Sequence, residues 1–406
     1  MHERLSEGVY QAMNSAPLSG ITIVSLEHAI AAPLCTRQLA ELGARVIKIE
    51  RRETGDFARH YDDRVKGQSS HFIWTNRSKL SMTLDLKHEL APSILDKLLS
   101  EADVFVQNLA PGAVKKMGLS YSDLHTQHPN LIVCNISGYG DEGPYKSKKA
   151  YDLLVQAEAG FLSITGTDEV MTKSGISIAD IAAGMQAHSA ILAALIQRSK
   201  TGEGSRIDIS MLEAMVEWMG FPLYYAYEGA SPPARSGADH ASIYPYGAFN
   251  TTDNKVIMLG LQNEREWESF CRDVLADESL IADSRFENNA LRSGNREELR
   301  DIIQTLFSTL NAEEIIKKLE AAQIAFANVN DMQDVWNHPQ LKALNRIIET
   351  ETPQGTVKSL KPPGNNSSYE SSLGSVPALG EQTREILESL GFEAGEIENF
   401  YTEGVV

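Results

Sequence analysis

The chain has 406 residues, a formal net charge of −18, and 42% hydrophobic residues. This length is enough for about two to three domains with substantial buried cores. The strong negative charge argues against nucleic acid as a partner, because binding to phosphate groups rewards a basic surface.

The distribution of apolar residues and cysteines favours a cytoplasmic protein. The polar start, MHERLSEGVYQAM, lacks the apolar core of a secretory signal. The longest apolar run, around Ile178 to Ile196, is interrupted by polar side chains, so we expect no membrane as a partner. The three cysteines lie far apart and match no disulfide or metal spacing; they are Cys35, Cys134 and Cys271.

The first 140 or so residues alternate between predicted strands and helices. A strand over Gly20–Leu26, a helix over Pro33–Gly43 and a strand over Ala44–Glu50 predict a parallel pair with a right-handed crossover. A further helix is predicted near Ile94–Ser100. Further strands are predicted over Leu80–Leu86, Ala102–Asn108, Leu131–Ser137 and, later, the RIDIS segment that follows Gly204. The pattern is typical of a doubly wound α/β fold.

A glycine-rich segment follows the strand over Leu131–Ser137. It reads GYGDEG, Gly138–Gly143, and matches the G-x-G-x-x-G pattern that would make an NAD-dependent oxidoreductase an alternative. However, Pro144 follows where a helix should open, and Asp141 and Glu142 lie where a pyrophosphate would bind. We interpret the segment as a turn, and Asp152 as the cap of the helix that starts after it.

The stretch Ser174–Arg198 predicts a long helix with one buried face, because its apolar residues recur at spacings of three and four. Asp180 lies where the helical pattern begins, and small residues follow it directly. A carboxylate there faces unpaired backbone N–H groups and the positive end of the helix dipole, which favour its anionic form. Asp180 is therefore either an N-cap or an accessible nucleophile, and one carboxylate can do both.

A change in composition near Phe221–Gly247, which is rich in Pro, Gly, Ser and Tyr, indicates a linker and a second domain. Within that domain the sequence predicts the strand KVIMLGL and helices over Glu266–Leu275 and Arg296–Leu319. We expect residues 1–220 plus 335–406 to form the large domain and residues 221–334 to form the linker and small domain.

Laid together in chain order, several of these segments resemble the family III CoA-transferases, the family of formyl-CoA transferase and the carnitine-type CoA-transferases. The segments are HAIAAPLCTRQLAELGARVIKIERRETGD, VQNLAPGAVKKMGL, GYGDEGPYKSKKAYDLL, GISIADIAAG, TGEGSRIDIS and ALGEQTREIL. The resemblance implies a large Rossmann-like domain built from both chain ends, with a smaller α/β domain inserted. It also implies an interlocked homodimer, coenzyme A as a substrate, and no permanently bound cofactor or metal.

The resemblance assigns site residues by position. Asp180 matches the nucleophilic aspartate of the family. The positions that match CoA-binding residues are His28, Ala29, Ala31, Arg51, Leu84, Lys87, Asn108, Lys116 and Lys149. Arg51 and the three lysines agree with this role, since they supply cations for CoA phosphates in an acidic chain.

Two departures from formyl-CoA transferase indicate a different acyl group. Ile30 replaces a glutamine beside the nucleophile's site, and RSGADHASIYPYG, Arg235–Gly247, replaces a glycine-rich loop. Arg235 and His240 are therefore predicted to contact substrate, because a guanidinium matches a carboxylate bidentately. We expect CoA transfer to small dicarboxylic acids of the succinate, mesaconate, itaconate or citramalate type.

The nearest alternative is an α-methylacyl-CoA racemase, which resembles this chain but carries His before Asp at the position of Tyr151–Asp152. Tyrosine, with a pKa near 10, is a poor partner base for proton transfer. The sequence therefore favours the transferase.

Overall fold

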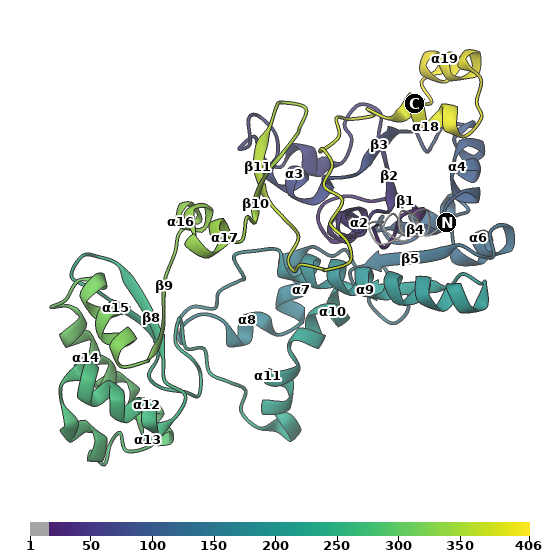
Figure 1. Ribbon diagram of the computed structural model, residues 1–406. Helices are drawn as coiled ribbons and strands as arrows, with labels where there is room; N and C mark the ends of the chain where they lie inside the picture. Colours follow the sequence, from purple (N-terminus) through teal and green to yellow (C-terminus); the bar gives the residue numbers. More distant parts are fainter. Residues whose placement is uncertain (1–15) are drawn as a thin grey trace, which may run out of the picture. The chain divides into compact units, whose positions relative to one another are not determined.

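The structure is a computed structural model that describes residues 16–406, so the amino-terminal segment used to predict the absence of a secretory signal lies outside the described residues. Two compact units make up the described chain. Unit 1 comprises 16–159, Ser174–Gly220 and Lys342–Val406, and unit 2 comprises Gly160–Lys173 and Phe221–Leu341. Unit 1 thus contains segments from both ends of the described chain (Figure 1).

The unit boundaries differ from the predicted domains at two places. Residues 160–173 and 335–341 were expected in the large domain, but they belong to unit 2. For the first of these segments the reason is long-range hydrogen bonding to unit 2, because the Gly237 N–H donates to the Gly166 carbonyl oxygen at 2.6 Å.

Unit 1 is built on a six-stranded sheet with the order β3-β2-β1-β4-β5-β6, in which every neighbouring pair is parallel. The strands are β1 Thr22–Leu26, β2 Arg45–Glu50, β3 Leu80–Thr83, β4 Val104–Gln107, β5 Ile132–Ser137 and β6 Arg206–Ser210. Each falls within a predicted strand, and the α/β class with a large parallel sheet is confirmed. The order reverses between β1 and β4, and ligands of open α/β sheets bind at such a switch point, beyond the carboxyl ends of the strands.

Helices cover both faces of this sheet, because the strands are apolar on both sides. One face packs against α2 and α9, which also contact each other. Side chains of the opposite face, such as Val24, Phe105 and Val133, share a buried cluster with residues of α4, α6, α18 and α19. The helices of unit 1 are α2 Ala31–Glu41, η1 Phe57–His60, α3 Ser70–Asn76, α4 Ala91–Ser100, α5 Ala113–Lys116, α6 Tyr121–Gln127, α7 Asp152–Glu158, α9 Ile178–Thr201, α10 Met211–Trp218, α18 Thr383–Ser389 and α19 Ala394–Glu403.

The carboxyl-terminal part of the chain adds a small antiparallel pair to unit 1. This pair consists of β10 Ile347–Thr350 and β11 Val357–Leu360. Helix α18 contacts β3, and its side chains Ile386 and Leu387 are fully buried.

Unit 2 has its own core around a three-stranded antiparallel sheet with the order β7-β8-β9. Its strands are β7 Tyr246–Asn250, β8 Val256–Gly260 and β9 Ala325–Asn328, and its helices are α8 Phe161–Ile164, η2 Tyr227–Gly229, α12 Glu264–Ser269, η3 Phe270–Leu275, η4 Glu278–Ala282, α13 Asn289–Gly294, α14 Arg296–Phe307, α15 Ala312–Ala321 and α16 Met332–Asn337. Helices α11 Gly220–Tyr225 and α17 Pro339–Ala343 contain the boundaries between the units.

The single helix predicted over Arg296–Leu319 is wrong in one respect, because the structure divides it into α14 and α15. Asn311 interrupts it: its side chain accepts from the Glu314 N–H, and the Glu314 carboxylate accepts from the Asn311 N–H. Such a reciprocal capping box starts a new helix rather than continuing an old one.

Helix α9 is long and apolar enough to cross a membrane by length and composition alone. The core helix of a soluble protein passes the same test, and Ala182, Ala183, Ala187 and Ile191 of α9 are completely buried.

Candidate functional site

The switch point of the sheet brings two of the predicted site residues together. His28 follows β1, and Asn108 follows β4. The His28 N–H donates to Asn108 Oδ1 at 3.0 Å, and Asn108 Nδ2 donates to the His28 carbonyl oxygen at 2.9 Å. The amide side chain therefore fixes the backbone of the turn that leads from β1 to α2.

A cavity of about 810 Å³ opens beyond the carboxyl ends of β1, β2 and β3. This volume is within the range of small-molecule sites, about 300–1,000 Å³. Five of the predicted CoA-binding residues line it, namely His28, Arg51, Leu84, Lys87 and Lys116. With Arg52, these residues place four cationic side chains, Arg51, Arg52, Lys87 and Lys116, in a lining that also contains five acidic side chains. The four cations are the groups that can bind phosphate.

The remaining predicted CoA-binding residues do not line this cavity. Ala29 and Ala31 lie in the same β1–α2 turn as His28, and Asn108 braces that turn. Lys149 lies in the loop before α7 and is exposed.

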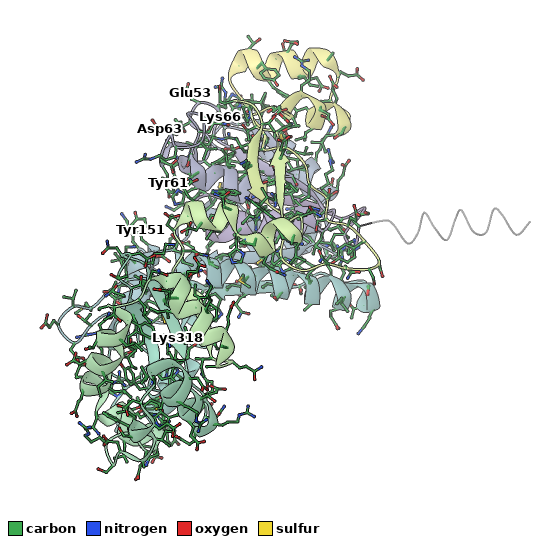
Figure 2. The ribbon with its side chains drawn as sticks, turned by 60° about the vertical axis from the view of Figure 1, so that its left-hand side comes forward. Glu53, Tyr61, Asp63, Lys66, Tyr151 and Lys318 are labelled. Carbon is green, nitrogen blue, oxygen red and sulfur yellow. The ribbon has the colours of Figure 1, made fainter. Side chains whose placement is uncertain are left out.

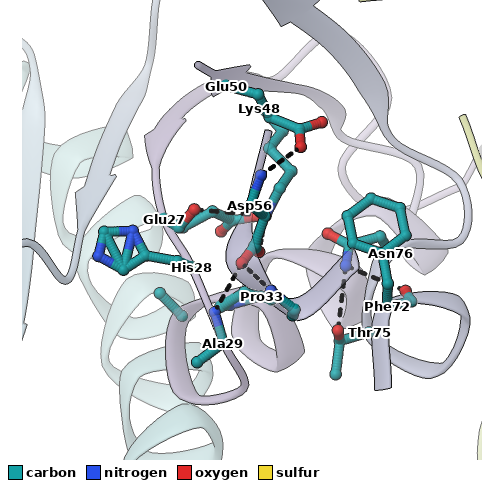
Figure 3. A network of polar contacts seen from close by, with 12 residues as sticks. Glu27, His28, Ala29, Pro33, Lys48, Glu50, Asp56, Phe72, Thr75 and Asn76 are labelled. Carbon is teal, nitrogen blue, oxygen red and sulfur yellow. Dashed lines mark hydrogen bonds and ion pairs between the residues drawn. The ribbon is translucent and has the colours of Figure 1, made fainter. Parts of the chain in front are cut away.

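A buried ion cluster lies beneath the β1–α2 turn (Figure 3). The Lys48 ammonium donates to Asp56 Oδ2 at 2.8 Å and lies 3.4 Å from Glu27 Oε1. Lys79 donates to the same Glu27 oxygen at 2.7 Å and to the Pro33 carbonyl oxygen at 2.9 Å. Buried charges are tolerated only when they are paired and hydrogen-bonded, and this cluster meets that condition.

The ion cluster shifts the pKa values of its own members. Burial opposes the charge of Glu27, but Lys79 and Lys48 together lower its pKa. Burial lowers the pKa of Lys79 to about 8, although Glu27 acts against the shift.

Asp180 is the third residue of α9, not its N-cap, which is Ser177. Capping is instead done by Asp152: its Oδ1 accepts from the Ala179 N–H at 2.8 Å and from the Asp180 N–H at 3.4 Å. The interpretation of Asp180 as a cap is therefore wrong. The role given to Asp152 is corrected too, because Asp152 caps α9 rather than its own helix, α7, whose N-cap is Tyr151.

Asp152 is held in place by a buried glutamine. Gln156 Nε2 donates to Asp152 Oδ2 at 2.7 Å, and Gln156 Oε1 accepts from the Ser174 N–H at 2.9 Å. One oxygen of Asp152 thus remains directed at α9.

The expectation that the helix terminus keeps Asp180 anionic needs correction. Burial, and then repulsion by the Asp152 carboxylate, raise the pKa of Asp180 to about 7, although the Ala31 N–H acts in the opposite direction as a hydrogen-bond donor. Two carboxylates lie at the amino terminus of the same helix, and their mutual repulsion offsets part of the stabilisation that the helix dipole gives to each negative charge. Such a raised value is typical of groups that do chemistry.

The amino-terminal ends of α2 and α9 meet at this carboxylate. Helix α9 approaches α2 closely at Gly184, where a Cβ atom would lie 2.6 Å from the Ala31 carbonyl oxygen. The Ala31 N–H donates to the Asp180 carboxylate. Asp180 therefore faces the unpaired N–H groups of the first turn of α2, a donor arrangement that stabilises developing oxyanions.

Tyr61, which the sequence did not single out as a site residue, lies near Asp180, and Tyr151 lies near Tyr61. The pKa of Tyr61 is raised to about 12 by burial and by the charges of Asp56 and Asp180, with Tyr151 also contributing. Figure 2 shows Tyr61 and Tyr151 on the same side of unit 1. The sequence around Tyr61 does not indicate that this side chain lies near Asp180, because the two residues are more than a hundred positions apart.

The two predicted substrate contacts lie in unit 2. Arg235 donates from Nε to the Thr167 carbonyl oxygen at 2.6 Å and from Nη2 to the Asp168 carbonyl oxygen at 2.7 Å. His240 Nδ1 accepts from the Ser242 and Ile243 N–H groups, and its ring stacks on Tyr246. The structure therefore shows both side chains engaged within unit 2, and their contact with substrate stays a prediction.

Comparison with known proteins agrees with this geometry. A family model described as CoA-transferase family III matches residues 18–383. The chain belongs to the family III CoA-transferases. It is therefore a CoA-transferase, an enzyme for which CoA is a substrate.

Two relatives of this CoA-transferase and one solved structure cover nearly all of the chain. The succinyl-CoA:glutarate CoA-transferase of Mus musculus is 34% identical over 401 residues, covering 96% of this chain and 90% of that protein. The succinyl-CoA:mesaconate CoA-transferase of Haloarcula hispanica is 29% identical over 394 residues, covering 93% and 97%. A CAIB/BAIF family protein from Brucella suis superimposes with a TM-score of 0.84 at 30% identity, covering 93% of this chain and 100% of that chain.

The cavity predicts that Lys116 binds a CoA phosphate. Lys116→Ala should raise the KM for acyl-CoA by about tenfold, because a charge-assisted contact of roughly 1.5–3 kcal/mol is lost, while kcat changes little. Steady-state kinetics measure this. The matched control is Lys115→Ala, which removes the neighbouring lysine that does not line the cavity. Equal KM values for the two variants would contradict the assignment.

The raised pKa predicts that Asp180 destabilises the resting protein. Asp180→Asn should raise the urea midpoint at pH 8 by an amount equivalent to a few kcal/mol, because it removes a buried charge beside Asp152 but keeps an acceptor for the Ala31 N–H. The gain should shrink as pH falls from about 7 towards 4, since folded Asp180 takes up its proton before the unfolded chain does.

Asp62 provides a control of opposite sign. Its carboxylate accepts from the Ser70 N–H at 2.9 Å and from the Arg64 N–H at 3.1 Å, and these bonds lower its pKa. Asp62→Asn should therefore lower the urea midpoint at pH 8. A loss of stability in Asp180→Asn at pH 8 would contradict the prediction, because it would show that the surroundings stabilise the ionised Asp180 carboxylate.

Proposed function

We propose that the protein transfers CoA between small dicarboxylic acids of four or five carbons, with Asp180 as the covalent nucleophile. One observation carries the mechanism: a single turn, from His28 to Ala31, borders both the cavity that Arg51, Lys87 and Lys116 line and the Asp180 carboxylate. CoA phosphates bound by Arg51, Lys87 and Lys116 would direct the thioester along this turn. The names of the two relatives support the acid class, since both act with succinyl-CoA on a second dicarboxylate.

The first half of the proposed reaction moves CoA onto the enzyme. An oxygen of the Asp180 carboxylate attacks the thioester carbonyl carbon, the C–S bond breaks, and a mixed anhydride and CoA thiolate result. The thiolate then attacks the aspartyl carbonyl carbon, releasing the donor carboxylate and leaving an aspartyl-CoA thioester. Such covalent catalysis divides one difficult exchange into easier steps.

The second half passes CoA to the acceptor. The acceptor carboxylate attacks the aspartyl thioester, the thiolate leaves, and a second anhydride forms. The thiolate then attacks the acceptor acyl carbon and releases the Asp180 carboxylate. We assign the Ala31 N–H to stabilise the oxyanions on the aspartyl side, because it already donates to this carboxylate.

Arg235 and His240 remain our proposed contacts for the distal carboxylate. For Arg235 this role requires that the guanidinium exchange its two backbone carbonyl partners, Thr167 and Asp168, for the acid. The resulting bidentate pair would select dicarboxylates over neutral acyl groups.

The racemase alternative is not favoured. The relatives reported above are named as CoA-transferases. In addition, Tyr151 occupies the position of the required histidine and is 70% exposed, so it does not provide a buried second base.

The proposal predicts the outcome of a substrate panel. Succinyl-CoA is mixed in turn with glutarate, mesaconate, acetate and carnitine, and the new acyl-CoA is detected by mass spectrometry. We expect kcat/KM to be at least tenfold higher for the two dicarboxylates, glutarate and mesaconate, than for acetate and carnitine. Below pH 7 kcat/KM should fall about tenfold per pH unit, because only ionised Asp180 attacks.

The same assay tests the nucleophile. Asp180→Ala should abolish exchange, and hydroxylamine should modify the Asp180 peptide only when the wild-type protein has first met succinyl-CoA. Asp141→Ala, which removes an exposed carboxylate, is the control. Full exchange by Asp180→Ala would end the covalent mechanism, and equal rates with acetate would end the dicarboxylate assignment.

We also propose that two chains form the interlocked homodimer implied by the resemblance. Support comes from large apolar side chains of α7, α9 and α10 that are more than a third exposed in the single chain, including Leu153, Leu154, Met185, Ile196 and Trp218. Exposed apolar surface of this kind marks interaction sites. Light scattering should give twice the chain mass of 44.7 kDa, and a mass of one chain at micromolar concentration would contradict the proposal.

A further inference from the structure

The β1–α2 turn contains a residue in an unfavourable backbone conformation. Ala29 has φ +64°, in the left-handed region, although it carries a Cβ atom. An L-residue pays a steric penalty there that glycine does not, so such a conformation persists only where its surroundings impose it. In this protein it occurs two residues before the Ala31 N–H that donates to Asp180.

Asp56 is the side chain that holds the Ala29 N–H, while Asn108 holds the preceding residue, His28. Asp56 Oδ1 accepts from the Ala29 N–H at 3.2 Å and from the Ala58 N–H at 2.9 Å, and Figure 3 shows the first of these bonds. Its Oδ2 accepts from Lys48 at 2.8 Å, and its own N–H donates to Glu50 Oε2 at 2.9 Å. Both oxygens and the backbone of Asp56 are therefore fixed.

The support behind Asp56 is buried as well. The side chains of Lys48, Glu27 and Lys79 have no exposed surface. Lys79 also donates to the Pro33 carbonyl oxygen in the first turn of α2. The ion cluster thus holds the β1–α2 turn at two points, the Ala29 N–H and the start of the helix.

We propose that Asp56 is a positioning residue, which holds Ala29 in its left-handed conformation and so directs the Ala31 N–H at the Asp180 carboxylate. Asp56 also lines the cavity, but in this role it acts through the backbone of three residues rather than through contact with substrate. The inference rests on the proposed role of Asp180. It goes beyond that role by naming the group that sets the donor geometry.

A simpler role for Asp56 must be separated from this one. Asp56 is also the N-cap of the short helix η1, and it neutralises Lys48. If these were its only roles, replacing it would lower activity through general loss of structure, and the conformation of Ala29 would not matter.

A double-mutant cycle with Ala29→Gly distinguishes the two roles. Asp56→Ala should lower kcat/KM at least tenfold, because the oxyanion donor is displaced. Ala29→Gly alone sets the reference rate for the second background, because Ala29 is also a predicted CoA-binding residue and its substitution can change KM by itself. Glycine adopts the left-handed conformation without strain, so this background no longer needs Asp56 to impose it. In the Ala29→Gly background, Asp56→Ala should cost no more than about threefold. The same loss in both backgrounds would overturn the proposal.

The pH profile gives a second readout that a structural defect would not move. The charged group that acts on Asp180 is the Asp152 carboxylate at the start of α7, and Tyr61 lies near enough that the Asp180 charge raises the pKa of its hydroxyl. Losing the Ala31 donor should move the acid limb of kcat/KM to higher pH in Asp56→Ala, whereas losing a nearby negative charge alone would move it to lower pH. An unchanged or lowered limb would also overturn the proposal.

Controls keep the test decisive. Asp62→Asn removes another hydrogen-bonded carboxylate of the same segment, one that has no bond to the β1–α2 turn, and should leave the limb where it is. Asp180→Ala, in the same assay, reports separately on the nucleophile: exchange that survives it refutes the covalent mechanism, whatever Asp56 does.

A fallback covers failure of Asp56→Ala to fold. Asp56→Asn keeps the volume, but its single amide oxygen must choose between Lys48 and the backbone N–H groups. We then expect a loss of at least threefold that Ala29→Gly removes, and wild-type kcat/KM in Asp56→Asn would refute the proposal.

Discussion

The close approach of α2 and α9 is the contact on which the whole site depends. Gly184 makes it possible, because any side chain there would meet the Ala31 carbonyl oxygen. The contact brings the first turn of one helix to the first turn of the other, so that an N–H of α2 reaches a carboxylate of α9. The switch point between β1 and β4 then places the CoA-sized cavity at the other end of the same turn. The four backbone residues from His28 to Ala31 therefore connect the cavity to the Asp180 carboxylate.

Electrostatics in this protein are local rather than global. The chain carries a net charge of −18, yet four cationic side chains line the cavity and two buried lysines lie under the turn. The buried lysines are matched by Glu27 and Asp56 at hydrogen-bonding distance, so they add rigidity and little net field. For Arg51, Lys87 and Lys116 in the cavity lining the described residues show no such ion pair, so an anionic ligand can neutralise them instead.

Much of the parallel sheet was predictable, and the reason is physical. Its strands are continuous apolar runs, and the helices between them have regular periodicity, so local pattern and tertiary structure agree. Gly43 after α2 and the strand RIDIS illustrate this agreement. The division of Arg296–Leu319 was not anticipated, because a capping box inside a periodic pattern is easily overlooked. The assignment of 160–173 to unit 2 depends on long-range hydrogen bonds that no local pattern reveals.

The site was predictable in its residues but not in its energetics. The position of Asp180 in a first helical turn follows from its sequence context, as does the place of His28 after a strand. The raised pKa does not, because it comes first from burial in the folded protein and then from Asp152, a residue 28 positions away that also caps the helix. Asp56 and the strain at Ala29 escaped notice for the same reason, since a backbone torsion leaves no trace in composition.

The shared helix terminus has a consequence for the energy profile of the enzyme. The Asp152 carboxylate repels a charge on Asp180, in surroundings that already oppose one. In the proposed mechanism Asp180 becomes an anhydride and then a thioester, and neither form carries that charge, so the repulsion would be removed. The free, ionised carboxylate would then be the electrostatically least favourable form in the cycle, and its relief would favour acylation.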